Sequence, residues 1–297
     1  GVLDMMIQLQ AKGIEFGYNS SPILKDVSFE IGPSKLVSIV GPNGSGKSTL
    51  IKCIDRILTP ARGSILIDRK EVTKMDRMEI AKNLSYVPQS SARTFSSNVF
   101  DTILMGRRPH IGWLSSSDDE EKVWEVLRLL GIEDLAMSGF GELSGGQQQK
   151  VLIARALVQE TKVMLLDEPT SNLDIWHQLD VMNIVSDLVK KRRMTALLAL
   201  HDLNLASKYS DGIIMMKKGR IMAVGDPASV LTPENIEAIY NVEVAVRSQS
   251  EEPFIVPVKQ IKTNGSRHHH DGRFFTSSKR RSRLPRSLTE LREIRLS

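Results

Sequence analysis

The residues best suited to chemistry form a glycine-rich run, Gly41-Pro42-Asn43-Gly44-Ser45-Gly46-Lys47-Ser48-Thr49. The run fits G-x-x-x-x-G-K-[ST], a pattern that binds nucleotide phosphates when it follows a strand and opens a helix. Its glycines let backbone N–H groups converge on phosphate oxygens, and the helix N-terminus adds the positive end of its dipole. We expect Lys47 to place its charge on the β and γ phosphates, and Ser48 to offer its hydroxyl to Mg²⁺.

Two carboxylates, Asp167 and Glu168, follow the apolar run Val163 to Leu166. Successive side chains on a strand point in opposite directions, so the two acids are expected to have different roles. Asp167 suits a second contact to Mg²⁺, made directly or through water, and Glu168 is left to orient or deprotonate an attacking water. Carboxylates in this position can also simply cap the next helix.

Alternating strand and helix patterns surround these motifs. Leu36 to Val40, Ser64 to Ile67, Leu84 to Val87, Val163 to Leu166, Thr195 to Leu200 and Gly212 to Met216 are expected to be strands. Apolar residues at i, i+3 and i+4 predict helices over Lys47 to Ile57, Asp119 to Leu130, Gly146 to Gln159, Ile175 to Lys191 and Leu203 to Tyr209. Such alternation predicts an α/β fold with a mainly parallel, covered sheet. The stretch Ile7 to Ile31 alternates in polarity and predicts antiparallel strands beside it.

The chain is expected to hold one large domain over residues 5–263. Residues 87–141 carry mostly helical pattern between two strand regions and predict a helical subdomain inserted into the sheet domain. After Tyr240 the periodic pattern weakens. Residues 264–297 are rich in Ser, Lys and Arg and almost without apolar periodicity, which predicts a disordered tail. The histidines within Gly265-Ser266-Arg267-His268-His269-His270 suggest that this tail is vector-derived rather than native.

The pentapeptide Leu143-Ser144-Gly145-Gly146-Gln147, whose last residue lies 20 positions before Asp167, makes the chain resemble the ATP-binding cassette (ABC) ATPases. The resemblance extends over about Ile7 to Arg247. It implies a P-loop NTPase core, an antiparallel β subdomain, the helical subdomain, and ATP with Mg²⁺. It also implies a head-to-tail homodimer in which Ser144, Gly145, Gly146 and Gln147 of one subunit face the γ-phosphate that the other subunit's P-loop holds.

The same resemblance assigns four further positions. Tyr18, 23 residues before Gly41, matches the aromatic residue that stacks on adenine, and Gln89 matches the glutamine that reaches the metal and the attacking water. Asp174, in Ser171-Asn172-Leu173-Asp174, matches the loop that crosses the dimer interface. His201 matches the histidine that contacts the γ-phosphate and links it to Glu168. Asp202 follows His201 directly, but it could equally be the N-cap of the helix from Leu203. We interpret His110, His177 and Cys53 as ordinary surface or packing residues.

The chain also resembles the cassettes of importers for iron–siderophore, haem and vitamin B12-type chelates. This narrower resemblance rests on Phe95 to His110, His201-Asp202-Leu203-Asn204 and His177-Gln178. That subgroup implies integral membrane permease subunits as partners, a substrate-binding protein as an indirect partner, and a peripheral position on the cytoplasmic face of the membrane. The apolar runs are far shorter than the ~18–20 residues that span a bilayer, no secretory signal pattern opens the chain, and the single cysteine permits no internal disulfide.

Two other classes of function remain open. The first is a soluble ABC ATPase that acts on DNA or ribosomes, although such proteins usually carry two cassettes or a long coiled coil, and this chain has no sustained heptads. The second is a nucleic-acid-binding module, suggested by the net charge of +5. Residues 264–297 hold nine Lys or Arg and three acids, a net of +6 that leaves −1 for residues 1–263. No nucleic-acid partner of the folded domain is therefore expected.

Overall fold

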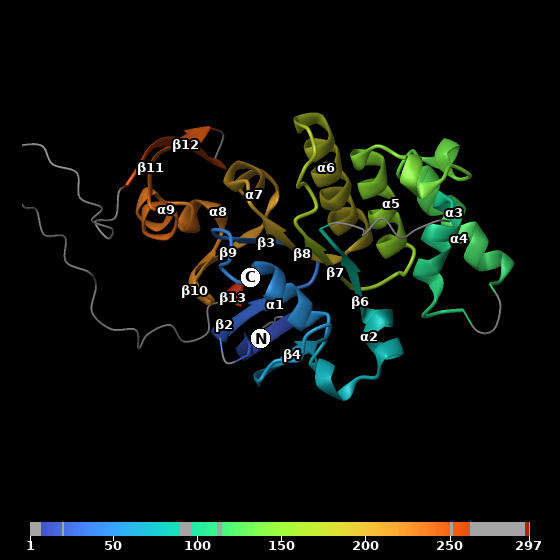
Figure 1. Ribbon diagram of the computed structural model, residues 1–297, viewed down its shortest axis with the longest axis horizontal. Helices are drawn as coiled ribbons and strands as arrows, with labels where there is room; N and C mark the ends of the chain where they lie inside the picture. The colour runs from blue at the N-terminus through green and yellow to red at the C-terminus, as the bar shows by residue number, and fades with distance from the viewer. Residues whose placement is uncertain are drawn as a thin grey trace, which may run out of the picture.

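A six-stranded sheet lies at the centre of the computed structural model, which describes residues 7–19, 21–89, 97–111, 115–249, 252–261 and 295–296 (Figure 1). Its order is β10-β9-β3-β8-β7-β6, with β10 antiparallel to β9 and the other five strands parallel. The strands are β3 (Leu36–Val40), β6 (Leu84–Val87), β7 (Val163–Asp167), β8 (Thr195–Leu200), β9 (Gly212–Lys217) and β10 (Arg220–Gly225). The predicted α/β fold with a mainly parallel sheet is confirmed.

A second, largely antiparallel sheet contains β1 (Leu9–Tyr18), β2 (Ser21–Ile31), β4 (Arg62–Ile67), β5 (Lys70–Glu71) and β13 (Arg295–Leu296). The antiparallel pair expected in Ile7 to Ile31 is confirmed. Ser64 to Ile67 is a strand as predicted, but it pairs antiparallel with β1 instead of joining the parallel sheet. The physical reason is visible in its burial, because only alternate residues, Ile65 and Ile67, are buried. Strands of a covered parallel sheet are instead buried at every position, as β3 is.

Helices cover both faces of the central sheet. The predicted helices correspond to α1 (Lys47–Ile54), α4 (Ser117–Leu129), α5 (Gly145–Leu157), α6 (Ile175–Arg192) and α7 (Leu203–Tyr209). Val37 and Ile39 of β3 pack into the core shared with α1 and the antiparallel sheet, whereas Leu36 and Val40 pack into the core shared with α5 and α6. This two-sided burial fixes the strand that leads into the glycine-rich run.

Between β6 and β7 the described residues hold helices but no named strand, as the sequence pattern predicts. The segment contains α3 (Val99–Leu104), α4 and the 3₁₀ turns Met105–Arg107, Glu133–Leu135 and Phe140–Glu142, and α5 packs against the same group. It lies to the right in Figure 1. Phe95, included in the subgroup resemblance, lies outside the described residues. The other helical elements in the described residues are α2 (Arg77–Asn83), α8 (Pro227–Val230), α9 (Pro233–Tyr240) and the 3₁₀ turn Val72–Lys74.

Arg107 holds the helical segment together from the inside. Its side chain is 6% exposed, and its Nε lies 2.9 Å from Asp119 Oδ1 on α4. A terminal nitrogen of the same guanidinium donates to the Val158 carbonyl at 2.9 Å and to Glu160 at 2.7 Å, just beyond α5. Ser116 adds a capping box with Asp119, and these hydrogen bonds lower the pKa of Asp119 to about 2. The subgroup-like segment around Arg107 is therefore a structural junction.

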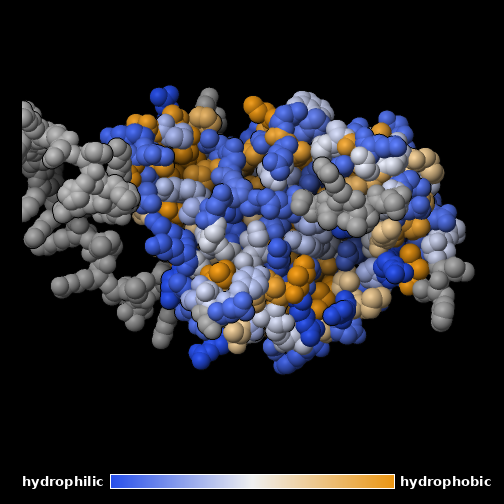
Figure 2. Space-filling model, viewed as in Figure 1, coloured by the Kyte–Doolittle hydropathy of each residue, from blue (hydrophilic) through white to orange (hydrophobic). Residues whose placement is uncertain are grey.

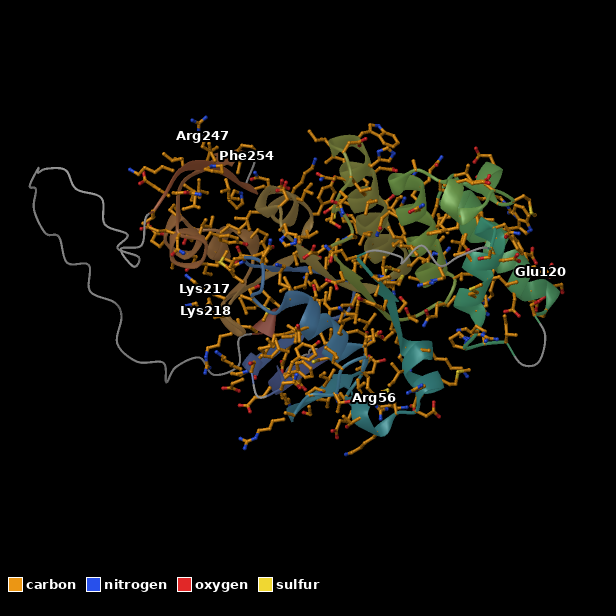
Figure 3. The ribbon with its side chains drawn as sticks, in the orientation of Figure 1. Arg56, Glu120, Lys217, Lys218, Arg247 and Phe254 are labelled. Atoms are coloured by element: carbon orange, nitrogen blue, oxygen red, sulfur yellow. The ribbon has the colours of Figure 1, made fainter. Side chains whose placement is uncertain are left out.

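The C-terminal part holds a hairpin that the sequence interpretation missed. β11 (Val242–Gln249) and β12 (Glu252–Gln260) pair antiparallel, although no strand was expected after Tyr240. The alternation of Val242, Val244 and Val246 was the available signal. Phe254 and Arg247 lie on the exposed outer side (Figure 3), and apolar side chains reach the surface over this region (Figure 2). Residues 264–294, most of the predicted tail, lie outside the described residues.

Within the described part of the chain, no helix is both long and apolar enough to cross a membrane.

Candidate functional site

The glycine-rich run begins where β3 ends and closes at α1, in the strand–turn–helix context that its sequence predicted. Gly41 has φ +156°, and a Cβ there would lie 2.2 Å from the Met216 carbonyl oxygen of β9. Gly46 has φ +105° and precedes the first residue of α1. No side chain fits without strain at either position, so the backbone is free to follow the curve that phosphate binding needs.

Lys47 is the positive charge inside this loop. It is 4% exposed, and its Nζ donates to the Gly41 carbonyl at 2.9 Å and to the Pro42 carbonyl at 3.4 Å. Burial lowers its pKa, while the carboxylates of Glu168 and Asp167 act in the opposite direction. The two carbonyls hold the ammonium at the mouth of the loop, where it can meet an anion.

The carboxyl ends of four neighbouring parallel strands lie at the same edge of the sheet. β3 leads to the glycine-rich loop, β8 to His201, β7 to Asp167 and Glu168, and β6 to Gln89. A cavity of about 300 Å³ opens there, lined by Gln89, Glu168, His201 and residues 43–49 of the loop. Ligands of open α/β sheets bind at this edge. The structure therefore brings together residues that are up to 158 positions apart in sequence (43 to 201).

Glu168 is the centre of a three-residue contact. Gln89 Nε2 donates to its Oε2 at 2.5 Å, and His201 Nε2 contacts its other carboxylate oxygen. The Glu168 backbone has φ +52°, a conformation that costs energy for a side-chain-bearing residue and is found at functional sites. The structure thus places Glu168 in contact with both Gln89 and His201, and their catalytic role stays a prediction.

Asp167 faces Ser48 instead. Ser48 Oγ donates to Asp167 Oδ1 at 2.6 Å, and Tyr86 from β6 reaches the other oxygen at 3.4 Å. Asp167 is 2% exposed, so its carboxylate is shielded from solvent. A hydroxyl and a carboxylate at the edge of a phosphate-binding loop are the oxygen donors that Mg²⁺ takes from proteins when phosphates and water supply its other ligands. The residues present fit that ion.

Ser144 and Asp174 cap two helices in the same way. Ser144 caps α5, accepting from the Gln147 N–H at 3.3 Å while the Gln147 side chain accepts from the Ser144 N–H at 2.9 Å. Asp174 caps α6 by accepting from the His177 N–H at 2.9 Å. These residues, with Gly145 and Gly146, do not line the cavity that the glycine-rich loop forms. Tyr18, 51% exposed and packed edge-on against Phe16, does not line it either.

Comparison with known proteins shows the family to which this chain belongs. Residues 24–171 match the ABC transporter family model. An uncharacterised ABC transporter ATP-binding protein of Methanocaldococcus jannaschii is 48% identical over 256 residues, which are 86% of this chain and 100% of the relative. The chain belongs to the ABC transporter ATP-binding proteins. It therefore binds and hydrolyses ATP, and it works with a membrane permease, as subunits of this family do.

Two further relatives carry more specific names. A petrobactin import ATP-binding protein of Bacillus anthracis is 37% identical over 246 residues, covering 82% of this chain and 90% of the relative. A solved structure described as an inward-facing conformation of a putative metal-chelate type ABC transporter has a TM-score of 0.75 at 29% identity, covering 86% of this chain and 98% of the other.

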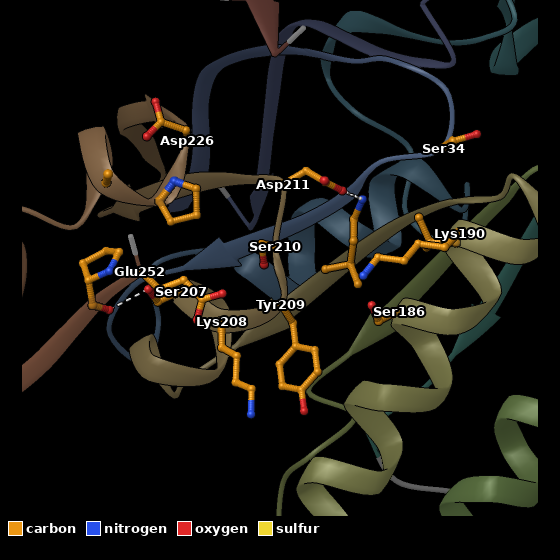
Figure 4. Close-up of a pocket in the computed structure, with 15 residues that line it drawn as sticks. Ser34, Ser186, Lys190, Ser207, Lys208, Tyr209, Ser210, Asp211, Asp226 and Glu252 are labelled. Atoms are coloured by element: carbon orange, nitrogen blue, oxygen red, sulfur yellow. Dashed lines mark hydrogen bonds between the residues drawn. The ribbon is translucent and has the colours of Figure 1, made fainter. Parts of the chain in front are cut away.

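This ABC ATPase also has a larger cavity, of about 390 Å³, whose lining shares no residue with the cavity at the glycine-rich loop (Figure 4). It lies between α6, α7, α8 and β12. Three of its polar side chains are used by the protein itself: Asp211 accepts from the Leu36 N–H at 2.7 Å, Asp226 caps α8, and Ser207 donates to the Pro253 carbonyl at 2.6 Å. We interpret it as the seam that attaches the C-terminal hairpin to the ABC core.

Two residues near the ATPase motifs escaped sequence reasoning. Tyr240, at the end of α9, places its hydroxyl out of solvent beside the backbone N–H of Gly41. Gly219, in the β9–β10 turn, donates to the Ser45 carbonyl at 2.9 Å and accepts from the Lys25 N–H at 2.8 Å. A Cβ on Gly219 would lie 1.8 Å from the Ile23 carbonyl oxygen. No local pattern marks either residue, because each meets the glycine-rich loop only through the tertiary fold.

Proposed function

We propose that this chain is the ATP-hydrolysing subunit of an importer for a metal chelate of the iron–siderophore, haem or cobalamin type. Support comes from the petrobactin import relative and from the metal-chelate type transporter structure, both of which match most of the chain. The relatives' names favour this function over a soluble ABC ATPase acting on DNA or ribosomes. The near-neutral charge of residues 1–263 agrees, since it offers no basic excess for a nucleic acid.

The observation that carries the catalytic part is the contact of Glu168 with both Gln89 and His201 beside Lys47. In this proposal Glu168 is the general base that takes a proton from the attacking water. Gln89 and His201 hold its carboxylate from opposite oxygens, so the base is oriented before water arrives. His201 also contacts the γ-phosphate, which links phosphate position to the base.

The loop residues 41–49 bind the phosphates, with Lys47 supplying the charge on the β and γ groups. Ser48, Asp167 and Gln89 would hold Mg²⁺ when nucleotide is bound, where it would supply positive charge against the phosphate oxygens during in-line attack. Tyr18 stacks on adenine through its exposed ring, at the side of the molecule where β1 ends.

Two copies of the chain form a head-to-tail homodimer in this proposal. Ser144, Gly145, Gly146 and Gln147 of one copy complete the γ-phosphate site of the other, and Asp174 approaches the other copy's phosphate loop. The N-terminus of α5 then presents free N–H groups and a positive dipole end to the γ-phosphate. ATP binding closes the dimer, and hydrolysis releases it.

The permease converts this closure into transport. The chain lies on the cytoplasmic face of the membrane, contacts the permease directly, and meets the substrate-binding protein only through it. The chelate does not touch this subunit. Its identity is therefore set by the other components.

The test is ATPase activity of the full chain reconstituted with its permease in lipid vesicles. Binding proteins loaded with a ferric siderophore, haem or cobalamin are added one at a time, with unloaded binding protein as control. We expect one chelate class to stimulate hydrolysis and to accumulate inside the vesicles. Stimulation by DNA or ribosomes without the permease, and none by any loaded binding protein, would establish the alternative function.

A further inference from the structure

His177, interpreted from sequence as an ordinary surface or packing residue, joins the two parts of the chain that the proposed dimer presents to its second copy. We call Ser144–Gln147 the signature turn and Ser171–Asp174 the interface loop. On one side, His177 Nδ1 lies 2.8 Å from Asp174 Oδ1. A carboxylate oxygen can only accept, so Nδ1 carries the proton and donates. Hydrogen bonds from the His177 backbone N–H and from its ring lower the pKa of Asp174.

On its other side, the His177 ring lies directly against the backbone of Gly146. A Cβ at Gly146 would be 2.0 Å from the ring Cδ2 and 2.7 Å from both Cγ and Nε2. Gly146 is buried, although the flanking Gly145 and Gln147 are not. Any side chain at this second glycine of the signature turn would displace the His177 ring, independently of any phosphate.

A second contact parallels the first one turn further along both helices. Lys150 of α5 forms an ion pair with Asp180 of α6 at 2.8 Å, with both side chains largely buried. Two ties about one helical turn apart prevent α5 and α6 from rotating independently at their N-terminal ends. The side-chain amide of Gln148 donates hydrogen bonds to two backbone carbonyls that precede the Ser144 cap. The side-chain amide of Gln178 does the same for two carbonyls that precede the Asp174 cap.

We propose that His177 is a positioning residue that makes the signature turn and the interface loop move as one body, so that both reach the second copy in register. The inference rests on the proposed dimer. In it, His177 never touches ATP. It acts by contacting both Asp174 and Gly146, so that a movement of one of these residues moves the other.

The histidine's two contacts can be removed separately. His177→Asn keeps a donor close to the position of Nδ1 and removes the ring from Gly146, whereas His177→Phe keeps a ring and removes the donor. His177→Ala removes both. Asp187→Ala, on the exposed face of the same helix, is the matched control. Because the His177 side chain is 30% exposed, we expect all four variants to fold, and thermal unfolding checks this.

We expect His177→Ala to lower kcat about tenfold while nucleotide affinity of the isolated subunit and the melting temperature stay close to wild type. His177→Asn and His177→Phe should each restore part of kcat, and Asp187→Ala should match wild type. In an Asp174→Ala background, His177→Ala should lower kcat by a smaller factor than it does in the wild-type chain, because both substitutions disrupt the same linkage. Fully multiplicative losses, or wild-type kcat in His177→Ala, would overturn the proposal.

ATP-dependent dimerisation in a Glu168→Gln background separates this inference from the proposed function. If the Glu168→Gln chain itself forms no dimer with ATP, the dimer proposal fails. If it does and Glu168→Gln/His177→Ala dimerises with the same ATP dependence, only the role of His177 is refuted. A weakened dimer in the double variant supports the role.

Discussion

The backbone N–H of Glu168 donates a 3.1 Å hydrogen bond to the carbonyl of Ala199 on the neighbouring strand. Glu168 has a left-handed conformation, immediately after Asp167 completes β7. Asp167 faces Ser48 while Glu168 faces Gln89 and His201, so each carboxylate has its own set of partners.

Glu168→Gln should nearly abolish ATP turnover while leaving ATP binding intact. The amide is almost the same size as the carboxylate but cannot accept the water's proton, so closed dimers should accumulate with ATP. Steady-state hydrolysis, equilibrium binding of labelled ATP and size-exclusion chromatography measure the three effects. Turnover at the wild-type rate would show that Glu168 is not the base.

Lys47→Ala should weaken nucleotide binding, because it removes the buried charge aimed at the phosphates. We expect the ATP dissociation constant to rise by at least about tenfold, since charge-assisted hydrogen bonds contribute roughly 1.5–3 kcal/mol. Lys52→Ala, on the same helix but outside the cavity lining, is the control. Equal losses in both variants would contradict a specific role for Lys47.

Arg107→Ala should destabilise the protein, because it leaves Asp119 without its buried cationic partner and breaks the bond to the Val158 carbonyl. Breaking a buried pair costs about 3–5 kcal/mol. Arg108→Ala changes the adjacent, exposed arginine and should have little effect. Denaturant unfolding compares the two, and similar midpoints would rule out the junction role of Arg107.

Asp55→Asn should stabilise the folded chain at pH 8 but not near pH 4. Burial raises the pKa of Asp55 to about 7 from its ordinary value of 3.8, so the folded state keeps a proton that the unfolded state loses between these values. Stability from this group is therefore present at low pH and lost as pH rises through 7. At pH 8, Asp55→Asn should raise the free energy of unfolding by at most about 4 kcal/mol.

The position of Asp55 adds to this effect, because it caps the C-terminus of α1, where the helix dipole is negative. Unfolding free energies of wild type and Asp55→Asn should converge on lowering the pH from 8 to 4. A difference that is constant over that range would mean that the carboxyl group titrates normally in the folded protein.

Motifs with a local physical cause were predictable from the sequence. The glycine-rich run, the strand before it and the helix after it lie within residues 36–54 and fold as expected. Glu168 was singled out by its place after a buried strand, whereas Gln89 and His201 were assigned from the family resemblance. All three follow parallel strands, and such strands end at one edge of a sheet. The α6 and α7 helices likewise match their apolar periodicity closely.

Features that depend on tertiary approach were not predictable. Nothing local distinguishes His177 from a surface histidine, since its importance comes from the backbone of Gly146, 31 residues earlier. Tyr240 reaches Gly41 across nearly 200 positions of sequence. The sheet to which Ser64 to Ile67 belongs was not predictable, because Ile65-Leu66-Ile67 is a continuous apolar run in the sequence and the alternation appears only in burial, with Leu66 half-buried between two buried isoleucines.

The strand β3, which leads into the phosphate loop, has β8 and β9 as its two neighbours, and both come from residues beyond 171. The loop's Ser45 is further held by Gly219. A fragment ending at residue 171 would contain every residue of the loop and the whole region matched by the family model, yet β3 would have two bare edges. During synthesis on the ribosome, the loop therefore cannot take its final shape until about residue 219 has emerged, so nucleotide binding should appear late and as a single step.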